Sequence, residues 1–396
     1  MKNFIFISPN FPENYWRFCR ELKNNGLNVL GIGDSEYFEL SNELRASLTE
    51  YYKVSSLENY DEVYRAVAFF SFRYGKIDWL ESNNEYWLEQ DARLRTDFNI
   101  RTGFKDEDMP KVKYKSEMKA FYKQAGVKVA RYCIAESEKA CKKFIEGVGY
   151  PVIVKPDNGV GANDTHKISN DGELAEFFRT KYPVSYIMEE FIQAEVNSYD
   201  AIVDSRGEPI FETGNVTPTS LMDVVTENGN SLFYIVNKPF EDVRDAGRRV
   251  LKAFKVRSRF VHFEFFRLTC DQPIGKKGEV VALEVNMRPS GGISPDMFNF
   301  ANSTDVYKIW ADMIAFDRTA VNQGERFYCA FAGRREGRDY VYSEQDIRDK
   351  YYYNLKTVGR VPRALSGAMG ELMYIANFKT KKELDEFYRE IVEERK

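Results

Sequence analysis

Short apolar runs alternate with amphipathic segments over the first hundred residues of the chain. The runs at 4–7, 29–32 and 77–80 have the length and composition of buried strands. Between them, residues 61–74 carry apolar side chains at i, i+3, i+4 and i+7, which predicts a helix with one apolar face. Strands that alternate with helices favour an open parallel α/β sheet.

The rest of the chain reads as a mixture of helices and longer strands. Residues 103–113 hold six charges and Pro110, so we expect a linker there. Period-two and period-3.6 patterns predict helices at 116–125, 137–146 and 242–254, and strands at 152–155, 186–211, 260–268 and 280–286. The predicted class is therefore α/β, with a parallel sheet first and strand-rich lobes after it.

Composition narrows the choice of function. The 396 residues are 43% hydrophobic, which is enough apolar side chain for two or three packed lobes. A net charge of −4 without a dense basic stripe argues against nucleic acid as a partner, and no run is long and apolar enough to cross a membrane. Five cysteines without a CxxC pair favour a reducing, cytoplasmic location. The first strand runs into Ser8-Pro9 rather than GxGxxG, so a dinucleotide site is not expected.

Two predicted strands carry carboxylates on one face. Alternation sets His262 and Glu264 together in the first strand, and Glu284 and Asn286 together in the second, with Leu283 and Val285 opposite. If the strands pair, two carboxylates and an amide oxygen share a face, which suits Mg²⁺, with Mn²⁺ as an alternative. The competing interpretation is that both glutamates are ordinary solvent-facing strand residues.

Lys155 ends an apolar strand and opens a loop that contains Gly159 and Gly161. Glycines let backbone N–H groups approach phosphates, and a lysine at the root of such a loop supplies a point charge. By itself the loop could equally be an ordinary turn.

Four segments together resemble the ATP-grasp fold over residues 115–292. The resemblance lies in Lys115 with its helix up to Gly126, the strand and lysine at 151–156, the hinge-like segment 188–195, and the ExNxRxxGG segment 284–292. D-alanine ligase, biotin carboxylase and carbamoyl phosphate synthetase share such segments, as do amino-acid and purine-pathway ligases. Ala194 stands where the hinge usually has glycine. The loop has fewer glycines than that of biotin carboxylase, which argues against biotin carboxylation.

The resemblance implies where ATP would bind. Lys115 and Lys155 would contact the α- and β-phosphates, and the loop that holds Gly159 and Gly161 would cover them. Glu189 and the backbones of Glu190 and Ile192 would read the adenine edge, while Glu195 would hold the ribose. Leu283 and Ile153 would sandwich the base.

The resemblance also implies a reaction. Glu264, Glu284 and Asn286 would hold magnesium, and Arg288 would stabilise the transferred phosphoryl group or the acyl phosphate. ATP would activate a carboxylate as an acyl phosphate, and an amine would then displace phosphate to give an amide or peptide bond. The expected partners are therefore a small-molecule carboxylate and amine, with homodimer formation left open.

Alternatives remain at this point. The same ending occurs in enzymes that activate bicarbonate, and a kinase would share the nucleotide chemistry. A non-catalytic ATP-binding sensor or partner subunit is a rival of another class, although all the expected metal ligands and phosphate lysines are present. His166 and His262, the only histidines, are expected to be hydrogen-bonded structural residues.

The predicted organisation has four parts. They are an N-terminal domain, a small ATP-grasp lobe with both lysines, a large lobe with hinge and metal site, and a C-terminal subdomain, at 1–108, 109–187, 188–324 and 325–396. Substrate specificity is expected in the first part and in residues 217–237.

Overall fold

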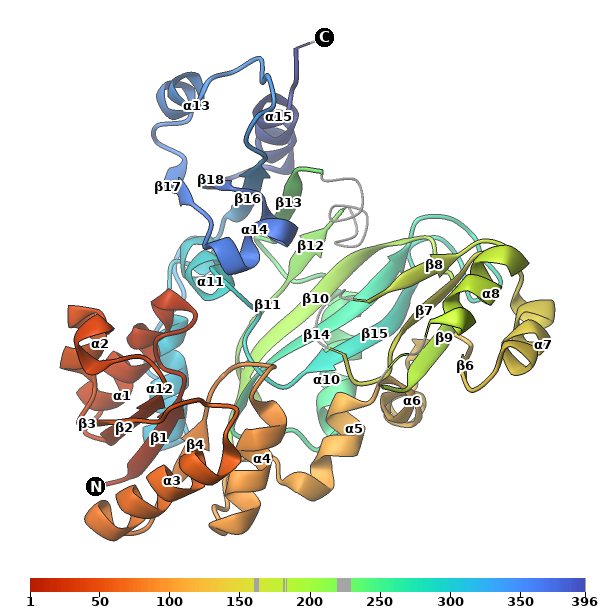
Figure 1. Ribbon diagram of the computed structural model, residues 1–396. Coiled ribbons are helices and arrows are strands. Elements are labelled where there is room, and N and C mark those ends of the chain that lie inside the picture. The colour runs from red at the N-terminus through yellow and green to blue at the C-terminus, as the bar shows by residue number, and fades with distance from the viewer. Residues whose placement is uncertain (160–163, 181, 183, 219–228, 396) are drawn as a thin grey trace.

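The computed structural model describes residues 1–159, 164–180, 182, 184–218 and 229–395. Over these ranges it shows a parallel α/β domain, a small antiparallel lobe and a long, mainly antiparallel sheet that carries the C-terminal elements (Figure 1). The predicted mixed α/β class is confirmed.

The first domain is a parallel sheet in the order β3-β2-β1-β4 among the described strands. Its strands are β1 (Asn3–Ile7), β2 (Asn28–Gly33), β3 (Glu50–Lys53) and β4 (Trp79–Glu81). Its helices are α1 (Trp16–Asn24), α2 (Asn42–Ser47), α3 (Tyr60–Tyr74) and α4 (Leu88–Asp97), with 3₁₀ turns at Glu13–Tyr15 and Tyr37–Glu39.

Both faces of this sheet are buried, which explains why its strands read as continuous apolar runs. Phe4 and Phe6 pack with α1 and with a helix from much later in the chain, α12 (Val306–Phe316). Ile5 and Ile7 point to the other face and pack with α3. The first domain is thus fixed to the large lobe by a shared core.

The expected linker at 103–113 is helical instead. A 3₁₀ turn (Asp106–Asp108) leads into α5 (Met109–Lys113), and then α6 (Lys115–Gln124) follows directly. Phe104, Met109 and Val112 are buried in the core of the large lobe, while all of the charged side chains except Lys113 are exposed or partly exposed. The high charge therefore marks one face of a packed helix, and Pro110 stands in its first turn, where proline is tolerated.

The small lobe is an antiparallel sheet in the order β6-β9-β7-β8 with two covering helices. Its elements are β6 (Tyr132–Ile134), α7 (Glu138–Val148), β7 (Val152–Pro156), β8 (His166–Ile168), α8 (Asp171–Arg179) and β9 (Tyr186–Glu190). Val152 and Val154 pack under the helices. The alternate residues Ile153 and Lys155 consequently face away from that core.

The long sheet holds ten described strands, in which β10, β14 and β15 are consecutive neighbours. In the large lobe these are β5 (Lys128–Val129), β10 (Ala194–Val203), β11 (Pro209–Thr213), β12 (Asn215–Thr217), β13 (Ser231–Ile235), β14 (Arg259–Leu268) and β15 (Val280–Asn286). Helix α10 (Glu241–Ala253) and α6 cover one face, where Val261, Phe263 and Val285 are buried.

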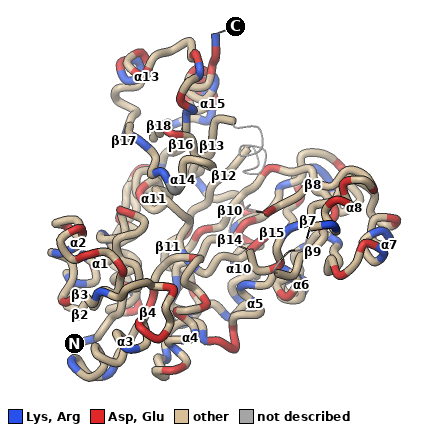
Figure 2. Tube along the Cα trace, in the orientation of Figure 1, with Lys and Arg blue, Asp and Glu red and all other residues tan. Residues whose placement is uncertain are grey.

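The C-terminal elements extend the same sheet rather than forming a new one. They are α11 (Ser294–Asn302), β16 (Tyr328–Arg334), α13 (Glu344–Lys350), β17 (Leu355–Arg360), α14 (Arg363–Met369), β18 (Leu372–Phe378) and α15 (Lys381–Ile391). β16 pairs with β13, and α15 packs on the strands through Leu384 and Phe387. Lys and Arg are intermixed with Asp and Glu in every part of the molecule (Figure 2). No described helix meets the length and apolarity that a membrane span needs.

Candidate functional site

The predicted carboxylate face exists. β14 and β15 are antiparallel neighbours, with Glu264 opposite Glu284 and His262 opposite Asn286. Phe263 and Val285 point to the opposite, buried face, as alternation requires. The side chains of Glu264 and Glu284 keep 26% and 18% of their surface exposed, so both carboxylates are accessible to a ligand.

Leu283 lies on a different face of β15 from the one predicted, because the strand contains a β-bulge. The register shifts between Glu264 and Phe265, which pair with Glu284 and Ala282, so Leu283 has no partner of its own. Ala282 and Val285 both lie in the core under α10. Leu283 and Glu284, which lie between these two core residues, therefore both point to the face that carries the site. Strict alternation had predicted that Leu283 and Glu284 point to different faces.

Lys115 bridges the two lobes. Its ammonium lies 3.2 Å from Glu284 Oε1 and donates to the carbonyl oxygen of Gly159 at 3.1 Å. It thus joins the large-lobe strand to the start of the small-lobe loop. Gly161, predicted beside Gly159 as a phosphate contact, lies outside the described residues.

Lys155 meets a carboxylate that also holds a second lysine. Lys155 Nζ is 2.6 Å from Glu189 Oε2, and Lys119 Nζ contacts the other oxygen of Glu189. Burial by itself raises the pKa of Glu189, but Lys119 and Lys155 outweigh it and hold the pKa at about 2. Lys119, Lys155 and Glu189 therefore form a buried, ionised cluster.

Sequence reasoning did not single out Lys119, although a signal was present. Lys119 lies four residues after Lys115 on α6, a spacing that puts both side chains on one helical face, and both are buried. Asp157 was also missed. It accepts hydrogen bonds from the backbone N–H of Ser116 at 2.8 Å and from its hydroxyl at 2.6 Å, while its own carbonyl accepts from the N–H of Lys115. Asp157 thus ties the two lysine segments together at the start of α6.

The hinge-like segment connects β9 to β10. Glu190 donates its backbone N–H to Arg131 O, and its carboxylate pairs with the Arg131 guanidinium. Ile192 is buried in a small apolar cluster, and Glu195 Oε1 accepts from Asn197 at 3.3 Å. Ala194 begins β10, where an extended backbone makes no demand for glycine.

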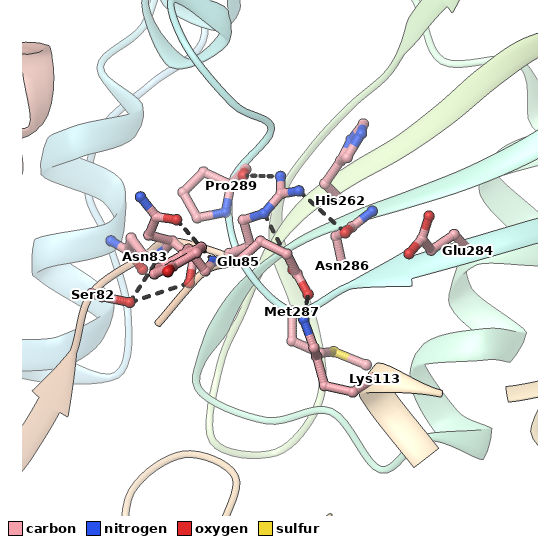
Figure 3. Close-up of polar contacts among 12 residues, drawn as sticks. Ser82, Asn83, Glu85, Lys113, His262, Glu284, Asn286, Met287 and Pro289 are labelled. Atoms are coloured by element: carbon pink, nitrogen blue, oxygen red, sulfur yellow. Dashed lines mark hydrogen bonds and ion pairs between the residues drawn. The ribbon is translucent and has the colours of Figure 1, made fainter. Parts of the chain in front are cut away.

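Arg288 lies beyond the strand rather than on its face, since β15 ends at Asn286. The turn nevertheless returns its guanidinium to the site, where Nη2 donates to Asn286 Oδ1 at 3.2 Å and Nη1 donates to Pro289 O at 2.9 Å. Its Nε lies 3.4 Å from Glu85 Oε2, on the loop after β4. In Figure 3, Glu85, Asn286 and Glu284 follow one another from left to right.

His262 is held between two carboxylates. Its Nδ1 is 2.8 Å from Asp200 Oδ1 and its Nε2 is 3.3 Å from Glu264 Oε1. Burial lowers its pKa, but Asp200 and then Glu264 raise the pKa to about 9. His262 is thus a hydrogen-bonded neighbour of the proposed metal face, as expected. His166 lies in the small lobe against Tyr182 and Phe177.

The donor set suits a hard cation. Glu264, Glu284 and Asn286 offer two carboxylates and one amide oxygen on neighbouring strands, and Mg²⁺ takes one or two protein carboxylates and completes its shell from phosphate and water. In the described part of the chain, no group of three or more His, Cys, Asp or Glu side chains forms an all-protein metal cage. The residues therefore fit a cation that is shared with a nucleotide.

Comparison with known proteins agrees with this geometry. Residues 114–288 match the family of the carbamoyl-phosphate synthase L chain, ATP binding domain. An L-arginine-specific L-amino acid ligase of Bacillus subtilis is 23% identical over 303 residues, which are 74% of this chain and 70% of that protein. The crystal structure of an L-amino acid ligase from Bacillus licheniformis superposes with a TM-score of 0.70 at 14% identity, covering 99% of this chain and 97% of that one.

A third likeness is to the biotin carboxylase domain of 2-oxoglutarate carboxylase from Hydrogenobacter thermophilus, solved as a dimer with MgADP and bicarbonate. Its TM-score is 0.68 at 15% identity, with 95% of this chain and 86% of that one covered. Residues 114–288 therefore match an ATP-binding domain of this family, and the predicted resemblance to the ATP-grasp fold is confirmed. The two L-amino acid ligases match most of the chain's length.

Proposed function

We propose that the protein is a magnesium- and ATP-dependent ligase that activates a carboxylate as an acyl phosphate and joins it to an amine, with release of ADP and phosphate. The observation that supports this most is the meeting of side chains from three separate segments of the chain. Lys115 contacts Glu284, Glu284 lies opposite Glu264, and Arg288 contacts Asn286 at the end of the same strand. Cations and oxygen ligands are thus concentrated where a triphosphate and a metal would meet.

In this proposal the small lobe and the hinge hold the nucleotide. Lys115 and Lys155 bind the α- and β-phosphates, and the loop that begins at Gly159 covers them. The backbones of Glu190 and Ile192 read the adenine edge, Glu195 holds the ribose, and Leu283 packs on the base. The bulge that turns Leu283 to the site face favours that last assignment. Glu189, also expected at the adenine edge, instead has both carboxylate oxygens paired with Lys119 and Lys155 and so positions these lysines.

Glu264, Glu284 and Asn286 would hold Mg²⁺, which when bound supplies positive charge to the phosphate oxygens during transfer. Arg288 then stabilises the charge that develops on the transferred group, since its guanidinium is fixed by several partners and needs little reorganisation. A carboxylate is a poor electrophile, whereas an acyl phosphate has a good leaving group that an amine can displace. Closure of the lobes would keep water from the intermediate.

We favour an amino acid as the acid substrate. The relatives named L-amino acid ligases support this choice because they match this chain over most of its length. The division into parts at 1–108, 109–187, 188–324 and 325–396 belongs to the same proposal, with specificity in the first part and in 217–237, of which 219–228 lie outside the described residues. All five cysteines are free, which suits a reducing cytoplasm.

The decisive experiment is to trap the activated acid. The purified protein is incubated with pooled amino acids, ATP, Mg²⁺ and hydroxylamine, and a hydroxamate is expected together with stoichiometric ADP and phosphate. Arg288→Ala should lower the hydroxamate yield without an equal loss of ATP affinity. A stable phosphorylated product would indicate a kinase, AMP and pyrophosphate would indicate adenylation, and no nucleotide turnover with any acid or bicarbonate would indicate a sensor.

A further inference from the structure

Glu85 is a buried carboxylate outside the predicted set of site residues, and it belongs to the first domain. It lies on the loop between β4 and α4, and only 9% of its surface is exposed. Each of its oxygens faces a different cation. Oε1 accepts from Lys113 Nζ at 2.9 Å, and Oε2 lies 3.4 Å from Arg288 Nε (Figure 3).

The loop that carries Glu85 is held in place from both sides. Ser82 donates its backbone N–H and its hydroxyl to Asp91 Oδ2 at 2.8 and 2.7 Å. Asn83 adopts a left-handed backbone with φ of 54°, and its carbonyl accepts from the Tyr15 hydroxyl at 2.8 Å. A strained residue fixed by neighbours on two elements gives a rigid loop. Glu85 therefore presents its carboxylate from a fixed point of the first domain.

A second contact from the same region reaches the residue before Arg288. Glu81, at the end of β4, pairs with Arg259 at 2.6 Å, and Arg259 Nη1 donates to the carbonyl oxygen of Met287 at 2.5 Å. The backbone at 287 is thus linked through Arg259 to the end of β4, and the side chain at 288 contacts the loop that follows β4. The parallel sheet of the first domain thereby sets the position of the turn that follows β15.

The three nitrogens of Arg288 have different partners. Nε faces Glu85, Nη1 donates to Pro289 O, and Nη2 donates to Asn286 Oδ1. A guanidinium is planar, so a partner at Nε fixes the plane and thereby the direction of the remaining N–H groups. The contact with Asn286 also orients that amide with its oxygen toward Arg288.

Glu85 stays ionised in this setting. Burial raises its pKa, but Arg288 and Lys113, and then Lys115, lower it by more, so the net pKa lies below the ordinary value. A carboxylate with a lowered pKa is a poor base, which argues against a role in taking a proton from the amine. The contacts of Glu85 with Arg288 and Lys113 instead indicate a residue that fixes the position of its cationic neighbours.

We infer that Glu85 is a positioning residue that holds the Arg288 guanidinium in the orientation that binds the transferred phosphoryl group. It makes the first domain a structural part of the reaction centre, in addition to any role in substrate choice. The inference rests on the phosphate-binding role that the proposed function gives Arg288. It does not require that the acid substrate be known.

The test measures phosphate binding, not turnover. Inorganic phosphate is titrated into the full-length protein saturated with MgADP, for wild type, Glu85→Gln, Arg288→Ala and the double variant. Glu85→Gln should weaken phosphate binding roughly tenfold, as expected when a partner that orients a ligand-binding group is lost, and leave MgADP affinity unchanged. The double variant should bind phosphate no more weakly than Arg288→Ala alone, because Glu85 acts only through Arg288.

Two further variants separate positioning from stability. Glu390→Gln removes a buried glutamate that pairs with Lys350 and Tyr351 in the C-terminal part, and it should bind phosphate like wild type. Glu85→Asp keeps the charge but withdraws it by one methylene, so its phosphate affinity should lie between wild type and Glu85→Gln. If Glu85→Gln does not fold, Glu85→Asp must still bind phosphate more weakly than wild type at unchanged MgADP affinity.

Several results would overturn the inference. They are wild-type phosphate affinity in Glu85→Gln, additive losses in the double variant, or a wild-type protein that binds no phosphate beside MgADP. Failure of the proposed function has a separate signature, because a wild type that forms no hydroxamate can still bind phosphate. In that case the cycle between Glu85 and Arg288 continues to test the positioning role.

Discussion

The candidate site has two ends, the proposed nucleotide end at Glu189 and the proposed metal end at Glu264 and Glu284, and their carboxylates are paired with cations in different ways. At the nucleotide end, Glu189 is 5% exposed and is shared by Lys119 and Lys155, with Lys155 at 2.6 Å. At the metal end, Glu264 and Glu284 remain 26% and 18% exposed, and their cationic partners stand at 3.3 and 3.2 Å. One end is closed and internally paired, whereas the other is open and only loosely paired.

This difference indicates different tasks. A carboxylate that is buried between two ammonium groups cannot be given up without leaving buried charge, so Glu189 fixes the lysines in place. Glu264 and Glu284 are partly exposed and each has one cationic partner beyond 3 Å, so their remaining oxygens stay open to a divalent cation. Substitutions at the closed end should therefore alter stability and nucleotide affinity, and substitutions at the open end should alter turnover.

The largest effect is expected at the open end. Glu284→Gln keeps the shape of the side chain but removes a charge from the proposed metal face, so turnover should fall at least about 100-fold. Turnover is measured across a magnesium titration. Glu279→Gln is the control, since Glu279 is an exposed residue just before β15 that pairs with Lys128. A Glu284 variant with most of its activity would remove the metal assignment.

At the closed end, Glu189→Gln should destabilise the protein by about 3–5 kcal/mol because it leaves two buried ammonium groups without their counter-charge. The free energy of unfolding is measured in urea. Glu138→Gln, which breaks an exposed pair with Lys142 on α7 of the same lobe, should cost less than about 1 kcal/mol. Equal effects of the two substitutions would contradict the closed character of this end.

Lys155→Ala should weaken ATP binding about tenfold or more, because a charged hydrogen bond from a rigid strand to a phosphate is lost. The dissociation constant is measured by calorimetry. Lys381→Ala, a change on the exposed start of α15, should leave that constant unaltered. If both variants bind ATP like wild type, the nucleotide site lies elsewhere.

The smallest effect is a dependence on pH. The pKa of Glu189 is lowered from 4.5 to about 2 in the folded protein, so its stabilising contribution is fully present above pH 4.5 and is lost as the pH falls toward 2. The difference in unfolding free energy between wild type and Glu189→Gln should therefore shrink over that interval. A difference that stays constant from pH 5 down to pH 3 would mean that the pairing with Lys119 and Lys155 does not hold Glu189 ionised.

Local pattern was sufficient for much of the fold. The apolar runs and the helical spacing predicted β1, β2, α3, α6, α7, α10, β14 and β15 to within a few residues, because burial follows period two in strands and 3.6 in helices. The same alternation predicted that Glu264 and Glu284 share a face, which the register confirms. The segment around 103–113 was misread, since charge on one face of a short helix resembles a linker when the buried face is not known.

The sequence by itself determined the class of the protein, because Lys115, Lys155 and the segment from Glu284 to Arg288 carry chemistry that can be recognised from residue type and spacing. Only the tertiary structure decided which groups meet. The bulge that turns Leu283 to the site, the shared position of Lys119 at Glu189, and the reach of Glu85 to Arg288 all depend on contacts between residues distant in the chain. Local periodicity reports which face of an element is buried. It does not report which other element covers that face, or where an irregular turn places a side chain, because both depend on the packing of the whole chain.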